Sequence, residues 1–140
     1  MKWPSGVLVS VLSILISLQG AGCGRDPGKR IEHKYGELVE LIKKSRGSPD
    51  RAVSEANAWF KKSDADFTSI CEDLDRLKQS DPDAATRAVL DHGIHHREAQ
   101  KELDRLIERW EPAARLKLSA LMVDLSQICL PDAEKITPFR

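Results

Sequence analysis

The amino-acid sequence predicts an all-α protein, a helical bundle of four to five helices. From residue 31 onward, apolar residues recur at intervals of three and four, the spacing that gathers them on one face of a helix. This part of the sequence lacks the apolar–polar alternation that is typical of a half-buried strand. Prolines and short polar pairs interrupt the periodic segments at several points. We therefore expect one helical domain over residues 31–131.

The first three predicted helices are separated by clear stop and start signals. The first begins near Ile31 and ends near residues 45–47, where the apolar periodicity stops. The second begins with Ser48 as N-cap and Pro49 at the first helical position, and the third begins at Ser63. The residues expected to face the core are Ile31, Tyr35, Leu38, Val39, Ile42, Ala52, Val53, Ala56, Trp59, Phe60, Phe67, Ile70, Cys71, Leu74 and Leu77.

The fourth predicted helix is the longest, running from about Pro82 to Glu111. Proline inside a helix costs about 3 kcal/mol, whereas it is tolerated at the first helical position. We expect the last long helix to be kinked or broken at Pro112, because an unbroken helix would extend about 70 Å and leave much of its apolar face uncovered. Leu130-Pro131 ends the pattern, and residues 132–140 are expected to form a loose C-terminal tail.

Three histidines in the fourth predicted helix are its most unusual chemical feature. The apolar face of this helix passes from Leu103 back through His96, His92 and Val89, so two histidines stand where the pattern requires apolar residues. His95 lies beside them, and the three imidazoles project within about 100° of arc on the helix surface.

A metal site is one interpretation of these histidines. His92 and His96, at positions i and i+4, can direct both imidazoles at one Zn²⁺, Ni²⁺ or Cu²⁺ ion, with His95 or a carboxylate as third ligand. Further candidates for the third ligand are Asp91, Glu98 and His33.

Two other interpretations remain open. In the first, His92 and His96 are half-buried structural residues that form hydrogen bonds to carbonyls or carboxylates of a facing helix. In the second, they sense pH, because burial lowers the pKa of a histidine and charging it would loosen the bundle.

The N-terminal segment has the features of an export signal. Lys2 supplies a positive charge, residues 7–18 form a short apolar run, and residues 20–22 (Gly-Ala-Gly) are the small residues that precede Cys23. Small-small-Cys after a short apolar run resembles the lipobox of bacterial lipoproteins. The resemblance implies that residues 1–22 are a signal peptide that is removed, and that Cys23 becomes the lipidated N-terminus that anchors the protein in a membrane.

This resemblance also implies a location. Residues 23–30 are then the lipidated cysteine and a flexible tether, and the protein lies on the periplasmic side of a bacterial cell envelope. Gly24 after the cysteine, in place of Asp, favours the outer membrane. The alternatives are an uncleaved signal anchor and a soluble secreted protein, which differ in whether residues 1–22 and an acyl group are present.

Cys71 and Cys129 are the even pair that remains once Cys23 is assigned to the signal. In an oxidising envelope such a pair can form a disulfide, which would add up to about 4–5 kcal/mol to stability in the chain-entropy model. The alternative is that they are two small buried hydrophobic residues with free thiols.

Composition and motifs limit the function. The 22 Lys and Arg residues balance the 22 Asp and Glu residues, so no long-range field gathers nucleic acid, and we expect no nucleic-acid partner. The sequence shows no His-Glu-x-x-His motif, Gly-rich phosphate loop or Ser/His/Asp order, so we do not expect an enzyme, and we expect no cofactor beyond the divalent transition metal of the alternative.

We therefore expect a non-catalytic, membrane-anchored module that binds or scaffolds a protein of the envelope. The alternative is a metal-binding bundle that uses His92, His96 and a third ligand, and an accessory subunit of an enzyme is a third hypothesis. An exposed apolar patch on residues 113–130 would favour the first, and a third ligand converging on the histidines would favour the second.

Overall fold

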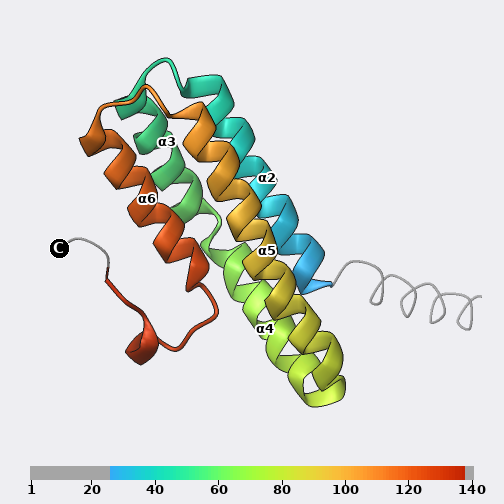
Figure 1. The fold of residues 1–140 in the computed structure, drawn as a ribbon. Helices are drawn as coiled ribbons and strands as arrows, with labels where there is room; N and C mark the ends of the chain where they lie inside the picture. Colours follow the sequence, from blue (N-terminus) through green and yellow to red (C-terminus); the bar gives the residue numbers. More distant parts are fainter. Residues whose placement is uncertain (1–25, 138–140) are drawn as a thin grey trace, which may run out of the picture.

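The computed structural model describes residues 26–137, and over that range it contains α-helices, one short 3₁₀ helix and no strand (Figure 1). The prediction of an all-α fold is confirmed. The elements are α2 (Pro27–Ser45), α3 (Pro49–Lys62), α4 (Asp64–Ser80), α5 (Pro82–Leu106), α6 (Pro112–Ser126) and the 3₁₀ helix η1 (Asp132–Glu134).

Capping by aspartate decides where α2 begins. The Oδ1 atom of Asp26 accepts hydrogen bonds from the backbone N–H groups of Gly28 (2.9 Å) and Lys29 (3.4 Å), and Pro27 follows as the first helical residue. These contacts satisfy donors that have no partner inside the helix. The helix therefore begins at Pro27 and not near Ile31, so the last part of the expected tether is helical.

The other helix starts vary in how they are capped. Asp81 caps α5 by accepting a hydrogen bond from the backbone N–H of Ala84 at 3.1 Å. Ser48 and Ser63 occupy the predicted N-cap positions of α3 and α4, but their side chains form no capping hydrogen bond.

The chain is broken, not kinked, before Pro112. α5 ends at Leu106 rather than at the expected Glu111, and α6 then runs back along the bundle (Figure 1). Trp110 lies in the turn and is buried, and its indole N–H donates to the backbone carbonyl of Arg46 at 2.9 Å. This contact packs the α5–α6 turn against the α2–α3 turn and reverses the chain without a glycine.

The helices form a bundle. At one end it contains four helices, α2, α3, α5 and α6. α2 and α5 lie side by side, α3 and α4 follow one another along the other side, and α6 packs against α3 and α5 (Figure 1). α6 ends at Ser126, so α4 and the first half of α5 continue beyond it as a hairpin of two helices.

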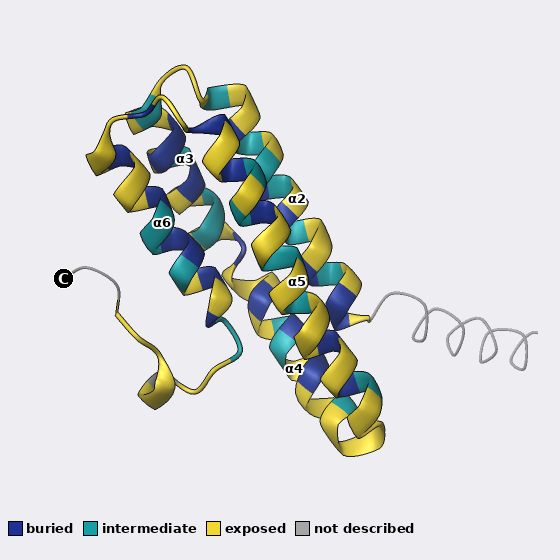
Figure 2. Cartoon of the chain, viewed as in Figure 1, coloured by how far each residue is buried: buried dark blue, intermediate teal, exposed yellow. Residues whose placement is uncertain are grey.

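Apolar side chains fill the interior in two clusters. Figure 2 shows in dark blue the buried positions along the helices. The large cluster draws on all five α-helices, and its most completely buried side chains are Leu38, Ile42, Leu103, Leu118, Met122 and Leu125. The small cluster joins α4 to α5 in the hairpin through Leu74, Ala85 and Ala88. Since the small cluster contains two alanines, the hairpin buries far less apolar surface than the four-helix end.

Polar side chains connect α2 to its neighbours. The indole N–H of Trp59 donates to Glu37 Oε2 at 2.9 Å, and Lys34 contacts Glu37 at 3.1 Å and Asp66 at 2.7 Å. Burial by itself would raise the pKa of Glu37, but the hydrogen bonds from Trp59 and Lys34 hold it below its ordinary value. On the same helix, Arg30 pairs with the buried Asp73 of α4 at 2.7 Å.

The C-terminal segment is held to the bundle by Gln127. Its buried side-chain amide donates to the backbone carbonyl of Ile136 at 3.0 Å and accepts from the backbone N–H of the same residue at 2.6 Å. The tail expected over residues 132–140 is therefore attached at residue 136, and residues 138–140 lie outside the described range.

Candidate functional site

Two of the three predicted histidines, His92 and His96, lie beside Tyr35 of α2. The hydroxyl oxygen of Tyr35 lies 2.9 Å from Nε2 of His92, and the rings of His92 and His96 both lie 5.8 Å from the tyrosine ring, centroid to centroid. His96 Nε2 donates to the backbone carbonyl of Met122 in α6 at 2.9 Å. Because a carbonyl only accepts, this nitrogen carries the proton.

Burial sets the protonation of this cluster. The pKa of His92 is lowered from its ordinary value, first by burial and then by the nearby His96, although a hydrogen bond to the backbone of Leu125 opposes the shift. Burial also raises the pKa of Tyr35. Both side chains are therefore neutral near pH 7.

The third histidine lies apart from this pair. The Nε2 atom of His95 lies 4.0 Å from a carboxylate oxygen of Glu32, and its Nδ1 atom lies 3.7 Å from Glu98. These residues line an acidic groove of about 600 Å³ between α2 and α5. The other acidic residues that line it are Glu37, Glu40 and Glu102.

The predicted metal ligands do not converge. His92 and His96 direct Nε2 to Tyr35 and to a backbone carbonyl, and His33 pairs with Glu37 at 3.2 Å on the surface. Among residues 26–137, no three His, Cys, Asp or Glu side chains are grouped in a way that would hold a metal ion. No observation in the described part of the chain therefore favours the metal-binding alternative.

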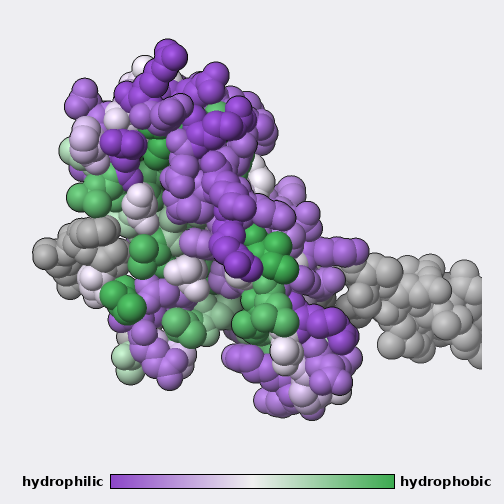
Figure 3. All heavy atoms as spheres, viewed as in Figure 1, coloured by the Kyte–Doolittle hydropathy of each residue, from purple (hydrophilic) through white to green (hydrophobic). Residues whose placement is uncertain are grey.

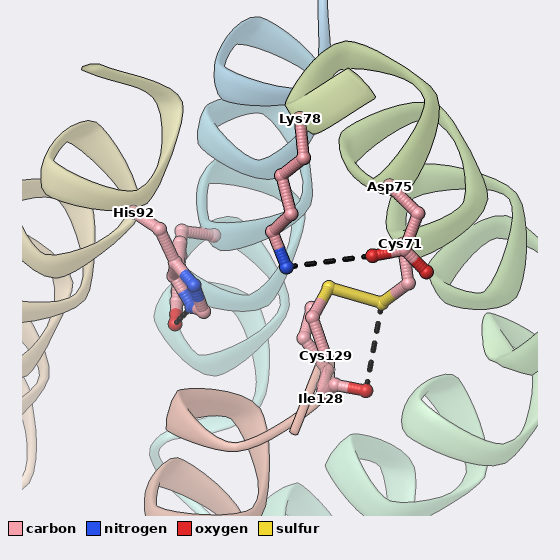
Figure 4. Close-up of a disulfide and its surroundings, with 7 residues drawn as sticks. Cys71, Asp75, Lys78, His92, Ile128 and Cys129 are labelled. Atoms are coloured by element: carbon pink, nitrogen blue, oxygen red, sulfur yellow. Dashed lines mark hydrogen bonds and ion pairs between the residues drawn. A yellow bond between two sulfur atoms is a disulfide. The ribbon is translucent and has the colours of Figure 1, made fainter. Parts of the chain in front are cut away.

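Cys71 and Cys129 form a disulfide (Figure 4). Their Cα atoms are 5.2 Å apart, within the usual range for a disulfide. The bond joins α4 to the segment that follows α6, two parts of the chain separated by 58 positions. It holds that segment against the hairpin of α4 and α5.

An apolar groove lies beside the disulfide, where α6 ends. It has a volume of about 280 Å³, and both His92 and Cys129 of the disulfide line it. Figure 4 shows these two residues near one another. The apolar groove is lined by Pro27, Ile31, Ile70, Leu74, Lys78, Ala88, Val89, His92, Ser126, Ile128, Cys129 and Leu130.

A patch of exposed apolar side chains lies next to the apolar groove on α5. We call it the α5 patch, and its members are Val89, Leu90 and Ile94, which are 50%, 62% and 42% exposed. Figure 3 shows apolar side chains gathered over this part of α5. The prediction that Val89 faces the core is wrong, because α6 ends before it reaches this turn of α5 and half of the side chain stays exposed.

Residues 113–130 hold only part of the exposed apolar surface of the described chain. Within residues 113–130, Leu118, Leu121 and Leu125 are buried, and the large exposed apolar residues are Leu116 and Leu130. The signal that locates the α5 patch is the pair Leu90 and Ile94, whose i, i+4 spacing puts them on one face away from the buried leucines.

The predicted lipidation site, Cys23, lies outside the described residues, so the structure leaves that prediction as it stands. Within the described part, none of the helices has both the length and the apolar character that crossing a membrane requires. Comparison of the chain with protein-family models, with curated proteins and with solved structures finds no match. The function must therefore be inferred from the chain itself.

Proposed function

We propose that this protein is a non-catalytic lipoprotein of the bacterial envelope, anchored on the periplasmic side through Cys23, whose helical domain binds a protein partner. The lipobox-like sequence supports the anchor and the location. The Cys71–Cys129 disulfide is consistent with an oxidising compartment outside the cytoplasm.

The α5 patch is the observation that carries the binding role. Large apolar side chains exposed together on a small domain are typical of interaction surfaces, in contrast to scattered single residues. Charged residues of both signs surround this patch, as a polar rim surrounds the apolar centre of an interface. The exposed charged neighbours along α5 are Arg87, Asp91, Arg97 and Glu98.

The charges of this rim favour a protein over a membrane surface. Binding to anionic lipid requires a cluster of about 4–8 Lys and Arg residues. The rim of the α5 patch instead alternates Arg87 with Asp91 and Arg97 with Glu98, so its net charge is close to zero. A protein surface with apolar side chains and mixed charges fits this patch.

Mass spectrometry of the protein extracted from membranes tests the anchor. We expect loss of residues 1–22 and added acyl mass on the peptide that begins with Cys23. A retained N-terminal methionine would show a signal anchor instead. Cleavage without acyl mass would show a soluble secreted protein, and either result would overturn the lipoprotein assignment.

Site-specific photo-cross-linking in the native host tests the binding role. A photoreactive residue at Leu90 should give one discrete cross-linked protein, and Ile94→Glu in the same chain should abolish that product. The matched control is a photoreactive residue at Lys117, an exposed position on α6 away from the patch. Equal cross-linking from both positions, or none from Leu90, would contradict the proposed role of the patch.

A further inference from the structure

The apolar groove differs from the α5 patch in shape. It is a recess beneath the end of α6, bounded by α2, α4, α5 and the disulfide-linked segment 128–130. Its polar lining side chains are Lys78, His92 and Ser126, and all the others are apolar. Lys78 also contacts Asp75 at 3.4 Å (Figure 4). A ligand with a largely apolar surface suits this lining.

The groove is a small recess that is open on one side. The groove volume of about 280 Å³ lies near the lower end of the range for small-molecule sites. Part of a narrow flexible chain, such as a section of the hydrocarbon tail of a lipid, can occupy a recess of this size.

The start of α2 lies at this groove. Pro27, the first residue of α2, is buried and lines it. Cys23 precedes Pro27 by four positions, so even a fully extended chain holds the two Cα atoms within about 14 Å of each other. A lipid attached to Cys23 is therefore always held close to the groove, at a high effective concentration.

We propose that the apolar groove binds one acyl chain of the lipid that Cys23 of the same molecule carries. This inference rests on the proposed lipid anchor. The acyl chain lies among Ile31, Leu74, Val89 and Leu130, and its attachment to Cys23 brings it to the Pro27 end. Binding one acyl chain here holds the helical domain close to the membrane in one orientation. In that orientation the α5 patch lies next to the bound acyl chain.

A photoreactive fatty acid tests this inference in the full chain. Cells that make the protein are fed a fatty acid with a terminal diazirine, their membranes are irradiated, and the protein is purified and digested. We expect the acylated Cys23 peptide to be cross-linked to peptides that contain Val89 or Leu130. Mixing isotopically light and heavy copies should give cross-links within one copy only.

A pair of neighbouring variants provides the control. Val89→Trp places a large ring in the groove and should abolish the cross-link, whereas Leu90→Trp changes the outer face of α5 and should keep it. The thermal melting of both variants, followed by circular dichroism, shows that each is folded. Persistence of the cross-link in folded Val89→Trp would overturn the inference.

The outcomes separate this inference from the proposed function. Absence of acyl mass on the Cys23 peptide overturns the lipid anchor and the groove assignment together. Acyl mass with cross-links only to membrane lipids overturns the groove assignment and leaves the anchor intact. Cross-links between light and heavy copies show that the groove takes the lipid of a neighbouring molecule, which also overturns the inference.

Discussion

The hydroxyl oxygen of Tyr35 and the Nε2 atom of His92 lie 2.9 Å apart at the centre of the bundle, although 57 positions separate the two residues. Tyr35 belongs to α2 and His92 to α5, the two longest helices within residues 26–137. The tyrosine is 3% exposed, so this polar contact replaces water for both groups. The contact therefore fixes how α2 and α5 are aligned along their length.

Removing the hydroxyl should destabilise the protein. Tyr35→Phe leaves His92 without this partner in a largely buried place, and a buried polar group that loses its partner costs about 1–3 kcal/mol. Urea denaturation of the wild type and the variant measures the difference. In a His92→Phe background the same change should cost much less. An equal cost in both backgrounds would show that the contact contributes nothing.

The lowered pKa of His92 predicts a dependence of stability on pH. The unfolded chain takes up a proton near the ordinary pKa of 6.5, whereas the folded protein does so only at lower pH. The contribution of His92 is therefore complete above pH 6.5 and is lost as the pH falls from 6.5 toward the folded pKa. The groups that face this ring are Tyr35 from α2, His95 and His96 from α5, and the backbone of Leu125 from α6.

Free energies of unfolding, measured between about pH 5 and pH 8, check this dependence. The decline on acidification should be weaker in His92→Gln, which cannot take up the proton. His33→Gln is the matched control, because the side chain of His33 is 77% exposed. If the two variants decline equally with pH, His92 is not the group responsible.

Reduction of the disulfide should lower stability more than any surface change. In the chain-entropy model, a crosslink between Cys71 and Cys129 stabilises the folded state by about 4 kcal/mol for a loop of this length. The double variant Cys71→Ser/Cys129→Ser should therefore melt at a lower temperature than the oxidised wild type. A reducing agent should lower the melting temperature of the wild type and leave that of the double variant unchanged. A wild type that is insensitive to reduction would contradict the prediction.

Two leucines of α5 should respond in opposite ways to truncation. Leu103 is fully buried, so Leu103→Ala should cost about 2–5 kcal/mol through lost contacts and a residual cavity. Leu90 is 62% exposed, so Leu90→Ala should change stability by less than about 0.5 kcal/mol. Chemical denaturation measures both values. A large loss for Leu90→Ala would mean that this side chain is needed for the fold and not for a partner.

The amide of Gln127 should control the mobility of the C-terminal segment. Gln127→Ala removes both hydrogen bonds to Ile136, so the backbone N–H of Ile136 should exchange faster with solvent. Amide hydrogen exchange followed by NMR reads this residue directly. Gln100→Ala is the control, because its amide contacts only Asp104 on the surface of α5. Unchanged exchange at Ile136 would show that other contacts hold the tail.

The helices and most of the core could be read from local patterns. Spacings of three and four predicted the buried faces of α2, α3 and α4, and prolines marked the starts of α3, α5 and α6. The start of α2 was missed, because Asp26-Pro27 lies in a short polar segment without apolar periodicity. The early end of α5 at Leu106 was missed as well, since the apolar pattern continues to Trp110.

The partners of the histidines could not be predicted from spacing within one helix. Their shared helical face was predicted correctly, and the structural interpretation describes His96, which donates to a carbonyl of the facing α6. The partner of His92 is a tyrosine 57 positions earlier in the chain, and spacing within α5 contains no information about it. Spacing likewise does not say that His95 lies within 4.0 Å of Glu32 in α2.

The sequence by itself determined the all-helical class, the helix faces and the candidates for lipidation and disulfide formation, because these depend on neighbours along the chain. Tertiary structure decided that Cys71 and Cys129 pair, that Val89 is exposed and that a groove opens beside Pro27. The physical reason is the length of α6 after the break at Pro112. This helix is too short to cover the hairpin of α4 and α5, and the apolar surface left uncovered is where we place both the partner and the lipid.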